Sequence, residues 1–439
     1  MRERAAARGD AKSRADTHEP HDRRRRAGCA FAAAVLAATV AGCGGSETVG
    51  HTITVTKTVI RHTKPTIAKA PKTRPSPSLA HAGSVPVNQM LGQMIVSPYA
   101  GDTPPPALLN RVRAGEVGGV ILFSENTAAG EASTRAQITE LQAAASAGGK
   151  PPLLIMTDQE GGEVRRLTWA PPFLAAADMR SVEVAQAEGA ATGRALREVG
   201  VNLDLAPVSD VVHVANSFLG TRSFGDEPLP VSERACAFAS GLASAGVGYT
   251  LKHFPGLGRA LGDTDNEPVT INASAQELRA DYATYVLCAS NPSGVVMVSN
   301  ATYPALTGNS TPAVMSPEIY KTELGQIVGY HGVTISDALG AGALAHDTDP
   351  AERAIDAGLD LALYAGTEGE SVDAYATLRE DLRTGGIPHS RVEDAYNAIM
   401  ALKAKIAGAA PQTTANYSQA SSYPEDIGPP ETISPEKGK

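Results

Sequence analysis

The chain of 439 residues has no excess of positive charge, no long apolar run and only four cysteines. Lysine and arginine number 38 against 47 acidic residues, so the charge does not indicate a nucleic acid as partner. An apolar run from Cys29 to Val40 is too short for a comfortable transmembrane helix. No Cys/His cluster has the spacing of metal ligands, and we expect neither a metal nor another cofactor.

The N-terminal segment has the order of an export signal. Four arginines at 23–26 precede the apolar run, as in the basic and hydrophobic regions of a secretory signal. The run leads into Val40-Ala41-Gly42-Cys43, which resembles a bacterial lipobox. We therefore expect a signal peptide at 1–43, diacylation of Cys43, and a protein anchored to the outer face of the cell membrane. The alternative is a plain signal peptide with an incidental cysteine.

The remainder of the chain divides by composition into three segments. Residues 44–86 are rich in Thr, Lys and Pro and are predicted to form a flexible tether. Residues 87–408 alternate apolar runs with helical patterns and are predicted to be the folded domain. Residues 409–439 are rich in Pro, Ser and Thr and are predicted to be disordered. Within the domain, Cys236 and Cys288 are interpreted as two buried thiols, with a disulfide as the alternative.

The folded segment is predicted to be an α/β protein. Short runs rich in branched residues are typical of buried parallel strands, and helical patterns follow them. Eight such units favour a single-domain (β/α)8 barrel, with a doubly wound open sheet as the alternative, and no nucleotide-binding fingerprint supports the latter. The predicted strands are 94–96, 119–123, 153–157, 201–205, 248–251, 295–298, 333–336 and 359–363. The predicted helices are 134–147, 181–199, 232–245, 274–289, 316–328, 351–357, 371–384 and 389–407.

Polar residues follow five of these strands, where a barrel carries its active site. They are Asp158, Asp210, the pair Lys252-His253, the pair Ser299-Asn300, and Asp337. A loop after the fifth strand adds Asp263, Asp265 and Glu267. Glycoside hydrolysis needs at least two carboxyl groups, and here they can come from separate elements of the barrel. Asp337 together with the acidic residues of this loop therefore predicts a site that cleaves sugars.

Four motifs, in the same order, resemble the N-terminal barrel domain of glycoside hydrolase family 3. They are DQEGGEVRR at 158–166, TRSFG at 221–225, KHFPG at 252–256 and SDAL at 336–339. The closest resemblance is to single-domain NagZ-type β-N-acetylhexosaminidases. It implies that Asp337 is the nucleophile of a retaining reaction. It also implies that Asp158, Arg166, Arg222, Lys252 and His253 bind sugar hydroxyls, although each could instead form a salt bridge at the rim.

One motif departs from that family pattern, KHFPGHGxxxxDSH, in which the final His is the acid/base. Here Leu257 stands at the first loop His, Asp263 at the Asp, Thr264 at the Ser and Asp265 at the catalytic His. One hypothesis is that Asp265 is the general acid, and Glu267 is the second candidate for this role. Asp263 carries a like charge that would raise the pKa of Asp265. The alternative is a sugar-binding lipoprotein with impaired catalysis.

The resemblance favours a carbohydrate substrate that carries β-linked N-acetylglucosamine, from cell-wall fragments or oligosaccharides. Because the dyad histidine is replaced, a β-glucoside or β-xyloside remains open. We expect a monomer that handles this substrate outside the cell. The glycine-containing loop from Gly256 to Pro268 is expected to be able to close over it.

Overall fold

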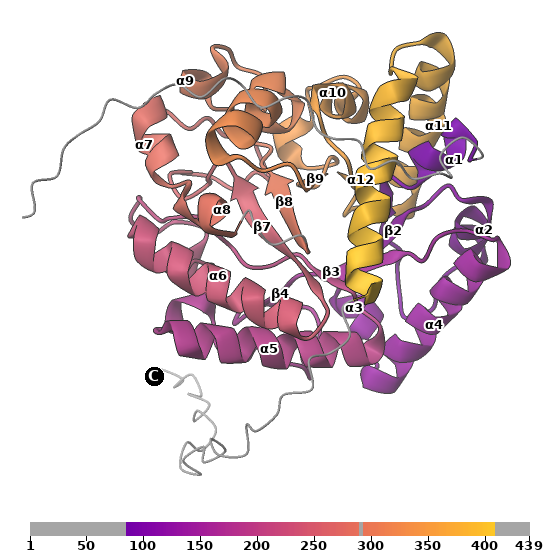
Figure 1. Ribbon diagram of the computed structural model, residues 1–439, viewed down its shortest axis with the longest axis horizontal. Helices are drawn as coiled ribbons and strands as arrows, with labels where there is room; N and C mark the ends of the chain where they lie inside the picture. The colour runs from indigo at the N-terminus through magenta and orange to yellow at the C-terminus, as the bar shows by residue number, and fades with distance from the viewer. Residues whose placement is uncertain (1–84, 289–292, 409–439) are drawn as a thin grey trace, which may run out of the picture. The chain divides into compact units, whose positions relative to one another are not determined.

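The computed structural model describes residues 85–288 and 293–408 (Figure 1). The predicted signal peptide, Cys43, the predicted tether up to residue 84 and the predicted tail from 409 lie outside the described residues. Within the two described ranges, no helix is both long and apolar enough to span a bilayer. The His, Cys, Asp and Glu side chains in the same ranges form no group suited to a metal ion.

Eight parallel strands form one sheet in the order β10-β1-β2-β3-β6-β7-β8-β9. The ring closes between β9 and the start of β10, where Leu361 N–H donates to Thr334 O at 2.9 Å and Ser336 N–H donates to Leu361 O at 3.0 Å. The predicted (β/α)8 barrel is confirmed. Its strands are β1 Ile95–Ser97, β2 Gly119–Leu122, β3 Leu154–Thr157, β6 Leu203–Asp204, β7 Gly248–Phe254, β8 Gly294–Val298, β9 Val333–Ser336 and β10 Ala362–Leu363.

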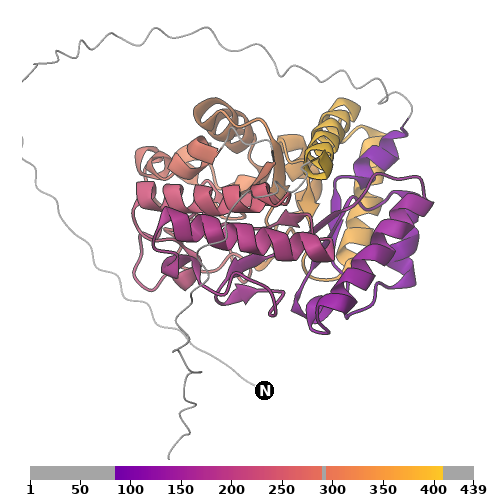
Figure 2. The same cartoon turned by 60° about the horizontal axis from the view of Figure 1, so that its bottom comes forward.

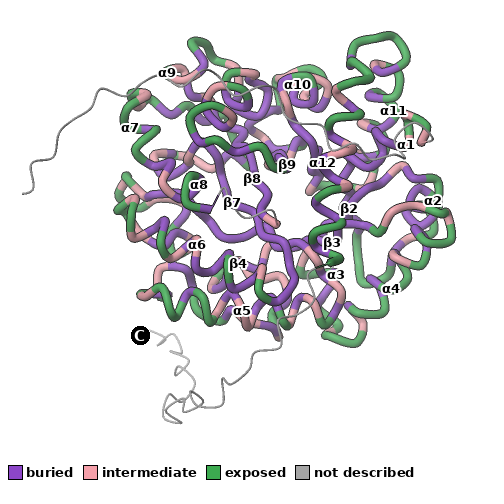
Figure 3. Tube along the Cα trace, viewed as in Figure 1, coloured by how far each residue is buried: buried purple, intermediate pink, exposed green. Residues whose placement is uncertain are grey.

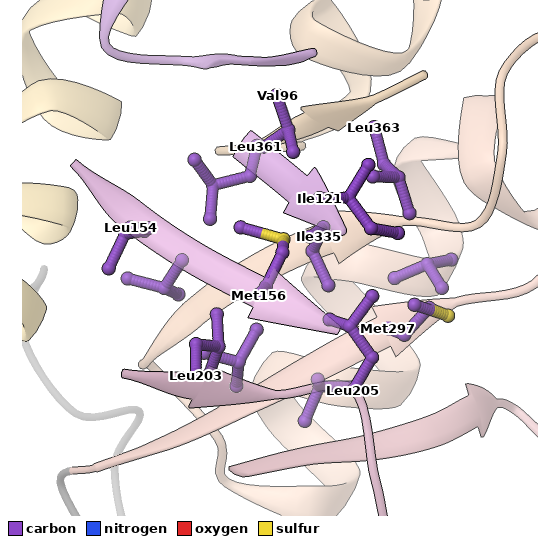
Figure 4. Packing of buried hydrophobic residues seen from close by; sticks show 14 of the residues in the cluster. Val96, Ile121, Leu154, Met156, Leu203, Leu205, Met297, Ile335, Leu361 and Leu363 are labelled. Carbon is purple, nitrogen blue, oxygen red and sulfur yellow. The ribbon is translucent and has the colours of Figure 1, made fainter. Parts of the chain in front are cut away.

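The strands are buried on both faces, which explains their apolar composition. Figure 3 shows them as a buried centre, with exposed residues on the outer turns of the surrounding helices. Val96, Met156 and Ile335 pack inside the ring (Figure 4). Parallel strands need crossover connections, and helices provide them.

The helices lie around the strands, and α5 and α6 run side by side in both views (Figure 2). Local signals set several ends: the Ser181 hydroxyl accepts a hydrogen bond from Val184 N–H at the start of α5, and Pro228 begins α6. The helices are α1 Val87–Gly92, α2 Pro106–Ala114, α3 Ser124–Thr127, α4 Glu131–Ala147, α5 Val182–Val199, α6 Pro228–Ser244, α7 Ala275–Ala280, α8 Ala283–Cys288, α9 Pro304–Thr307, α10 Pro350–Ala357, α11 Glu368–Thr384 and α12 His389–Gly408.

Several elements differ from the sequence prediction, among them α1, α2, α3 and α9, where no helix was predicted. The predicted helix 274–289 is broken into α7 and α8 near Asp281, whose carboxylate pairs with His213 at 2.9 Å. Ile319–Val328 is a π-helix within the predicted range 316–328. The segment after β3 forms a small antiparallel hairpin, β4 Gln159–Gly161 and β5 Val164–Arg165, which was not predicted because its sequence is polar and glycine-rich.

The interpretation of Cys236 and Cys288 as two thiols is wrong, because the structure joins them in a disulfide. Helix α6 packs against α8 and brings the two Cα atoms to 5.8 Å, within the range that a disulfide spans. Sequence periodicity predicted helices at both places but gave no information about which helix faces meet.

Candidate active site

A cavity of about 240 Å³ opens at the carboxyl ends of the strands. All eight side chains predicted to act in catalysis or sugar binding line it. They are Asp158, Arg166, Arg222, Lys252, His253, Asp263, Asp265 and Asp337. The barrel therefore gathers at one place the residues that the sequence spreads over 180 positions, from 158 to 337.

The floor of the cavity is apolar. Ile121, Leu205, Met297 and Leu363 line it, and they come from the ends of the second, fourth, sixth and eighth strands of the ring. Figure 4 shows these four side chains inside the barrel. Such a layer from alternate strands is the usual filling of this fold, and it gives the polar groups above it a rigid, dry base.

A buried ion cluster forms one wall. Lys252 Nζ lies 2.8 Å from Asp158 Oδ1 and 2.6 Å from Glu160 Oε1. Arg222 donates to both oxygens of Glu160, each at 2.8 Å, in the two-pronged geometry that is strongest for a guanidinium. Arg166 adds a longer contact, 3.8 Å from its Nε to Asp158 Oδ2.

The cluster keeps its groups ionised. Burial by itself raises the pKa of Glu160, but the charges of Lys252 and Arg222 outweigh it and lower that pKa from 4.5 to about 2. Burial lowers the pKa of Lys252, and the charges of Asp158 and Glu160 more than offset this effect, so its pKa is raised. Glu160 and Lys252 are therefore charged and held in place in the structure.

Sequence reasoning missed Glu160 as a site residue. Asp158 and Glu160 are two positions apart in an extended segment, which puts their side chains on the same face. That spacing was a usable signal, since both carboxylates meet Lys252.

Asp210 was seen at a strand end but was not assigned a role. Its Oδ2 lies 2.7 Å from His253 Nδ1, and its Oδ1 accepts a hydrogen bond from Leu257 N–H at 2.6 Å. The Asp210 side chain is fully buried, and its contact with Nδ1 orients the imidazole. With Nδ1 engaged, Nε2 is the nitrogen of His253 left to contact a substrate.

Asp337 directly follows β9 and faces the cavity. Its backbone N–H donates to Val298 O at 3.0 Å, and its Oδ1 accepts a hydrogen bond from Ala338 N–H at 2.8 Å. Among the residues that the structure describes, none donates a hydrogen bond to the other oxygen of this carboxylate.

Asp265 lies at the rim of the same cavity, where its side chain is open to solvent. Partial burial, Asp337 and Asp263 raise the pKa of Asp265, and the opposite effects of His253 and Arg222 are smaller. Asp263 Oδ1 accepts a hydrogen bond from Asp265 N–H at 3.0 Å, which holds the turn between them. Glu267 is not among the described residues that line the cavity. Its carboxylate points toward Gly262 instead.

A larger cavity of about 390 Å³ lies at the opposite end of the barrel, by Gly332 and Gly358 at the amino ends of β9 and β10. None of the predicted site residues lines it. Its Asp360 and Arg391 pair with each other at 2.7 Å, and Arg391 also donates to Leu359 O. These contacts tie α12 to the loop before β10, so we interpret this region as structural.

A (β/α)8 barrel with carboxylates and charged donors around one cavity at the carboxyl ends of its strands has the layout of a glycosidase, and comparison with known proteins supports that class. Residues 87–402 match the family described as the glycosyl hydrolase family 3 N-terminal domain. The chain therefore belongs to glycoside hydrolase family 3, and it is a glycosidase.

Similar proteins include an uncharacterised secreted glycosyl hydrolase of Arthroderma benhamiae, 32% identical over 72% of this chain and 92% of that protein. The β-hexosaminidase LpqI of Mycobacterium tuberculosis is 34% identical over 58% of this chain and 70% of its own length. A solved structure of a family 3 β-N-acetylglucosaminidase from Paenibacillus superposes with a TM-score of 0.71 at 28% identity, over 76% of this chain and 65% of that one.

Proposed function

We propose that the protein is a retaining β-N-acetylhexosaminidase in which Asp337 is the nucleophile and Asp265 the acid/base. One observation carries the proposal: Asp265 and Asp337 line the same cavity, and the charge of Asp337 helps to raise the pKa of Asp265. A pair of carboxyl groups in unlike environments can divide the two roles, one ionised and one protonated.

In the first step a carboxylate oxygen of Asp337 attacks the anomeric carbon of the sugar. Asp265 gives its proton to the glycosidic oxygen, the bond from that oxygen to the anomeric carbon breaks, and the alcohol leaves. The sugar is then an ester of Asp337. Ala338 N–H, which donates to Asp337 Oδ1, fixes the carboxylate during the attack.

Ester formation removes the negative charge of Asp337. Because that charge is one cause of the raised pKa of Asp265, the pKa falls in the intermediate. Asp265, now ionised, takes a proton from a water molecule as the water oxygen attacks the anomeric carbon, and Asp337 departs as a carboxylate. Both groups return to their starting states, and the sugar keeps its configuration.

The ion cluster suits the binding of sugar hydroxyls. Asp158 accepts hydrogen bonds, whereas Arg166, Arg222 and Lys252 donate them in charge-assisted contacts, and His253 adds a further polar group beside the cluster. Because Glu160 and Asp210 already hold Arg222 and His253, little side-chain freedom remains to be lost on binding.

The relatives support N-acetylhexosamine as the sugar and export as the location. Two of the three are named a β-hexosaminidase and a β-N-acetylglucosaminidase, and the third is named as secreted. The Cys236–Cys288 disulfide supports an oxidising compartment. Diacylation at Cys43 and a monomeric state complete the proposal.

The test compares nitrophenyl β-N-acetylglucosaminide, β-glucoside and β-xyloside as substrates of the full chain, with the configuration of the first product followed by NMR. We expect the N-acetyl substrate to be preferred and the β-anomer to form first. Asp337→Asn is expected to remove turnover. Glu267→Gln neutralises a carboxylate of the Asp265 loop that lies outside the cavity, and it serves as the control. Saturable sugar binding without turnover on every substrate would instead favour the impaired, sugar-binding alternative.

A further inference from the structure

The loop that carries Asp265 is joined to the segment after Asp337 by two backbone hydrogen bonds. Gly342 N–H donates to Asp265 O at 2.9 Å, and Ala343 N–H donates to Thr264 O at 3.0 Å. Gly342 is five positions beyond Asp337. A short stretch of chain and two hydrogen bonds thus connect the two carboxyl groups.

Gly342 permits this contact because it has no side chain. A Cβ atom there would lie 2.3 Å from Asn266 O and 2.5 Å from Asn266 C. Those atoms belong to the backbone of the Asp265 loop and cannot rotate away, so any larger residue must push the loop aside. Gly342 is not among the glycines with positive φ. An alanine would therefore tolerate its conformation, and the restriction is one of space.

The other end of the loop is fixed as well. Leu257 and Ala260 are each 1% exposed, Leu257 N–H donates to Asp210, and His213 N–H donates to Gly258 O at 2.8 Å. Leu261 at the tip is 91% exposed, and residues 265–268 are exposed too. The sequence predicts a loop that can close over a substrate. In the structure, hydrogen bonds at both ends already hold this loop beside the cavity.

We propose that Gly342 is a positioning residue: because it has no side chain, the loop that carries Asp265 can pack against the segment after Asp337, which places Asp265 at the cavity. This inference rests on the proposed roles of Asp265 and Asp337. It implies that the acid is in place before substrate binds, and that the segment following the nucleophile serves both catalytic groups. Gly342 itself contacts no substrate and acts through Asp265.

The test is Gly342→Ala in the full chain, with kcat/KM measured on aryl β-glycosides whose leaving phenols span a range of pKa. A general acid contributes about 10²–10⁴-fold, and mainly when the leaving group is poor. We expect a loss of about 10–100-fold with unsubstituted phenol as leaving group, and of less than about 3-fold with dinitrophenol. The charge of Asp337 is one cause of the raised pKa of Asp265, so moving Asp265 away from Asp337 should lower that pKa. The alkaline limb of the pH profile should therefore move to lower pH.

Gly369→Ala is the matched control. It makes the same substitution in α11, where the nearest atom to the new Cβ is Thr367 Oγ1 at an ordinary 3.6 Å. It should leave the rates and the pH profile as in the parent. An equal loss on every leaving group in Gly342→Ala, with an unmoved pH profile, would overturn the positioning role.

Two further measurements separate this inference from the proposed function. Asp265→Ala, tested on the same series, should show a dependence on the leaving group at least as steep as Gly342→Ala, and azide should accelerate both variants while forming the β-glycosyl azide. If Asp265→Ala shows no such dependence, the assigned acid is wrong. If Asp265→Ala shows it and Gly342→Ala does not, only the positioning role fails.

Hydrogen exchange of the parent protein keeps the inference testable even if Gly342→Ala does not fold. The amides of Gly342 and Ala343 should be protected, since both donate to the Asp265 loop. Exchange of these two amides at the rate of free peptide would contradict the docked loop.

Discussion

Glu160 accepts hydrogen bonds from Arg222 and lies 2.6 Å from Lys252, so it pairs with two buried cations at once. Removing one partner of a buried ion pair leaves the others uncompensated, which costs about 3–5 kcal/mol. Glu160→Gln keeps the shape of the side chain and removes its charge. We expect it to lower the free energy of unfolding at pH 7 by about 3 kcal/mol, as measured by urea denaturation.

The same substitution gives a pH dependence with a definite sign. The pKa of Glu160 is lowered from 4.5 to about 2 in the folded state, so its stabilisation is present above pH 4.5 and is lost as pH falls toward 2. The difference in unfolding free energy between the parent and Glu160→Gln should therefore shrink over that range. A difference that stays constant from pH 5 to pH 2 would contradict the depressed pKa.

Asp263 is expected to act on Asp265 through charge. Asp263→Asn retains the oxygen that accepts the Asp265 N–H and removes a like charge that raises the pKa of Asp265. Because a general acid works in its protonated form, the alkaline limb of kcat/KM should move to lower pH in this variant. Glu267→Gln is the control, and an unmoved limb in Asp263→Asn would argue against the coupling.

At the scale of elements, strand β7 continues further than its apolar pattern predicted. The prediction ended at 251, whereas β7 extends to Phe254 and so includes Lys252 and His253. Both residues lie at the break in the β7–β8 register between Leu251 and Phe254. Their backbone is held from the β6 side, where Ser209 N–H donates to Lys252 O at 2.6 Å and Asp210 Oδ1 accepts a hydrogen bond from His253 N–H at 3.2 Å. Placement on a strand gives catalytic and binding groups a more rigid support than a loop does.

Helices α6 and α8 are joined by the disulfide, which closes a loop with a sequence separation of 52. Cross-linking such a loop restricts the unfolded chain, and removal of a disulfide typically costs about 2–4 kcal/mol. We expect the paired substitution Cys236→Ser, Cys288→Ser to lower the free energy of unfolding by this amount under oxidising conditions.

The parent under full reduction should match the doubly substituted chain, which provides the control for the serine side chains themselves. Peptide mapping without reductant should recover the two cysteine peptides linked. Recovery of two alkylated thiols from the native protein would return the interpretation to buried free cysteines.

At the scale of the whole molecule, the proposed anchor and the barrel have separate tasks. Cys43→Ser should release the protein from the membrane fraction, since two acyl chains are needed for stable attachment. Turnover should be unaffected, because Cys43 precedes the family-matched region 87–402. Fractionation followed by an activity assay tests both statements, and retention of the variant in the membrane fraction would contradict acylation at Cys43.

The local sequence predicted much of the fold, and physical reasons explain where it did not. All eight barrel strands occur where branched apolar runs indicated them, because a strand buried on both faces needs that composition. The break near Asp281 was not predicted, because it coincides with a pairing to His213, which is 68 positions away. The β4–β5 hairpin lacks the alternation that would reveal a strand.

The sequence by itself determined the barrel, the order of its strands, and the strand ends that carry Asp158 and Asp337, because periodicity and strand-end position are local properties. Only the tertiary structure decided which distant groups meet. It paired Glu160 with Arg222, joined Cys236 to Cys288, and packed the Asp265 loop against Gly342. Each of these contacts depends on the packing of one element against another, and no pattern within a single segment encodes it.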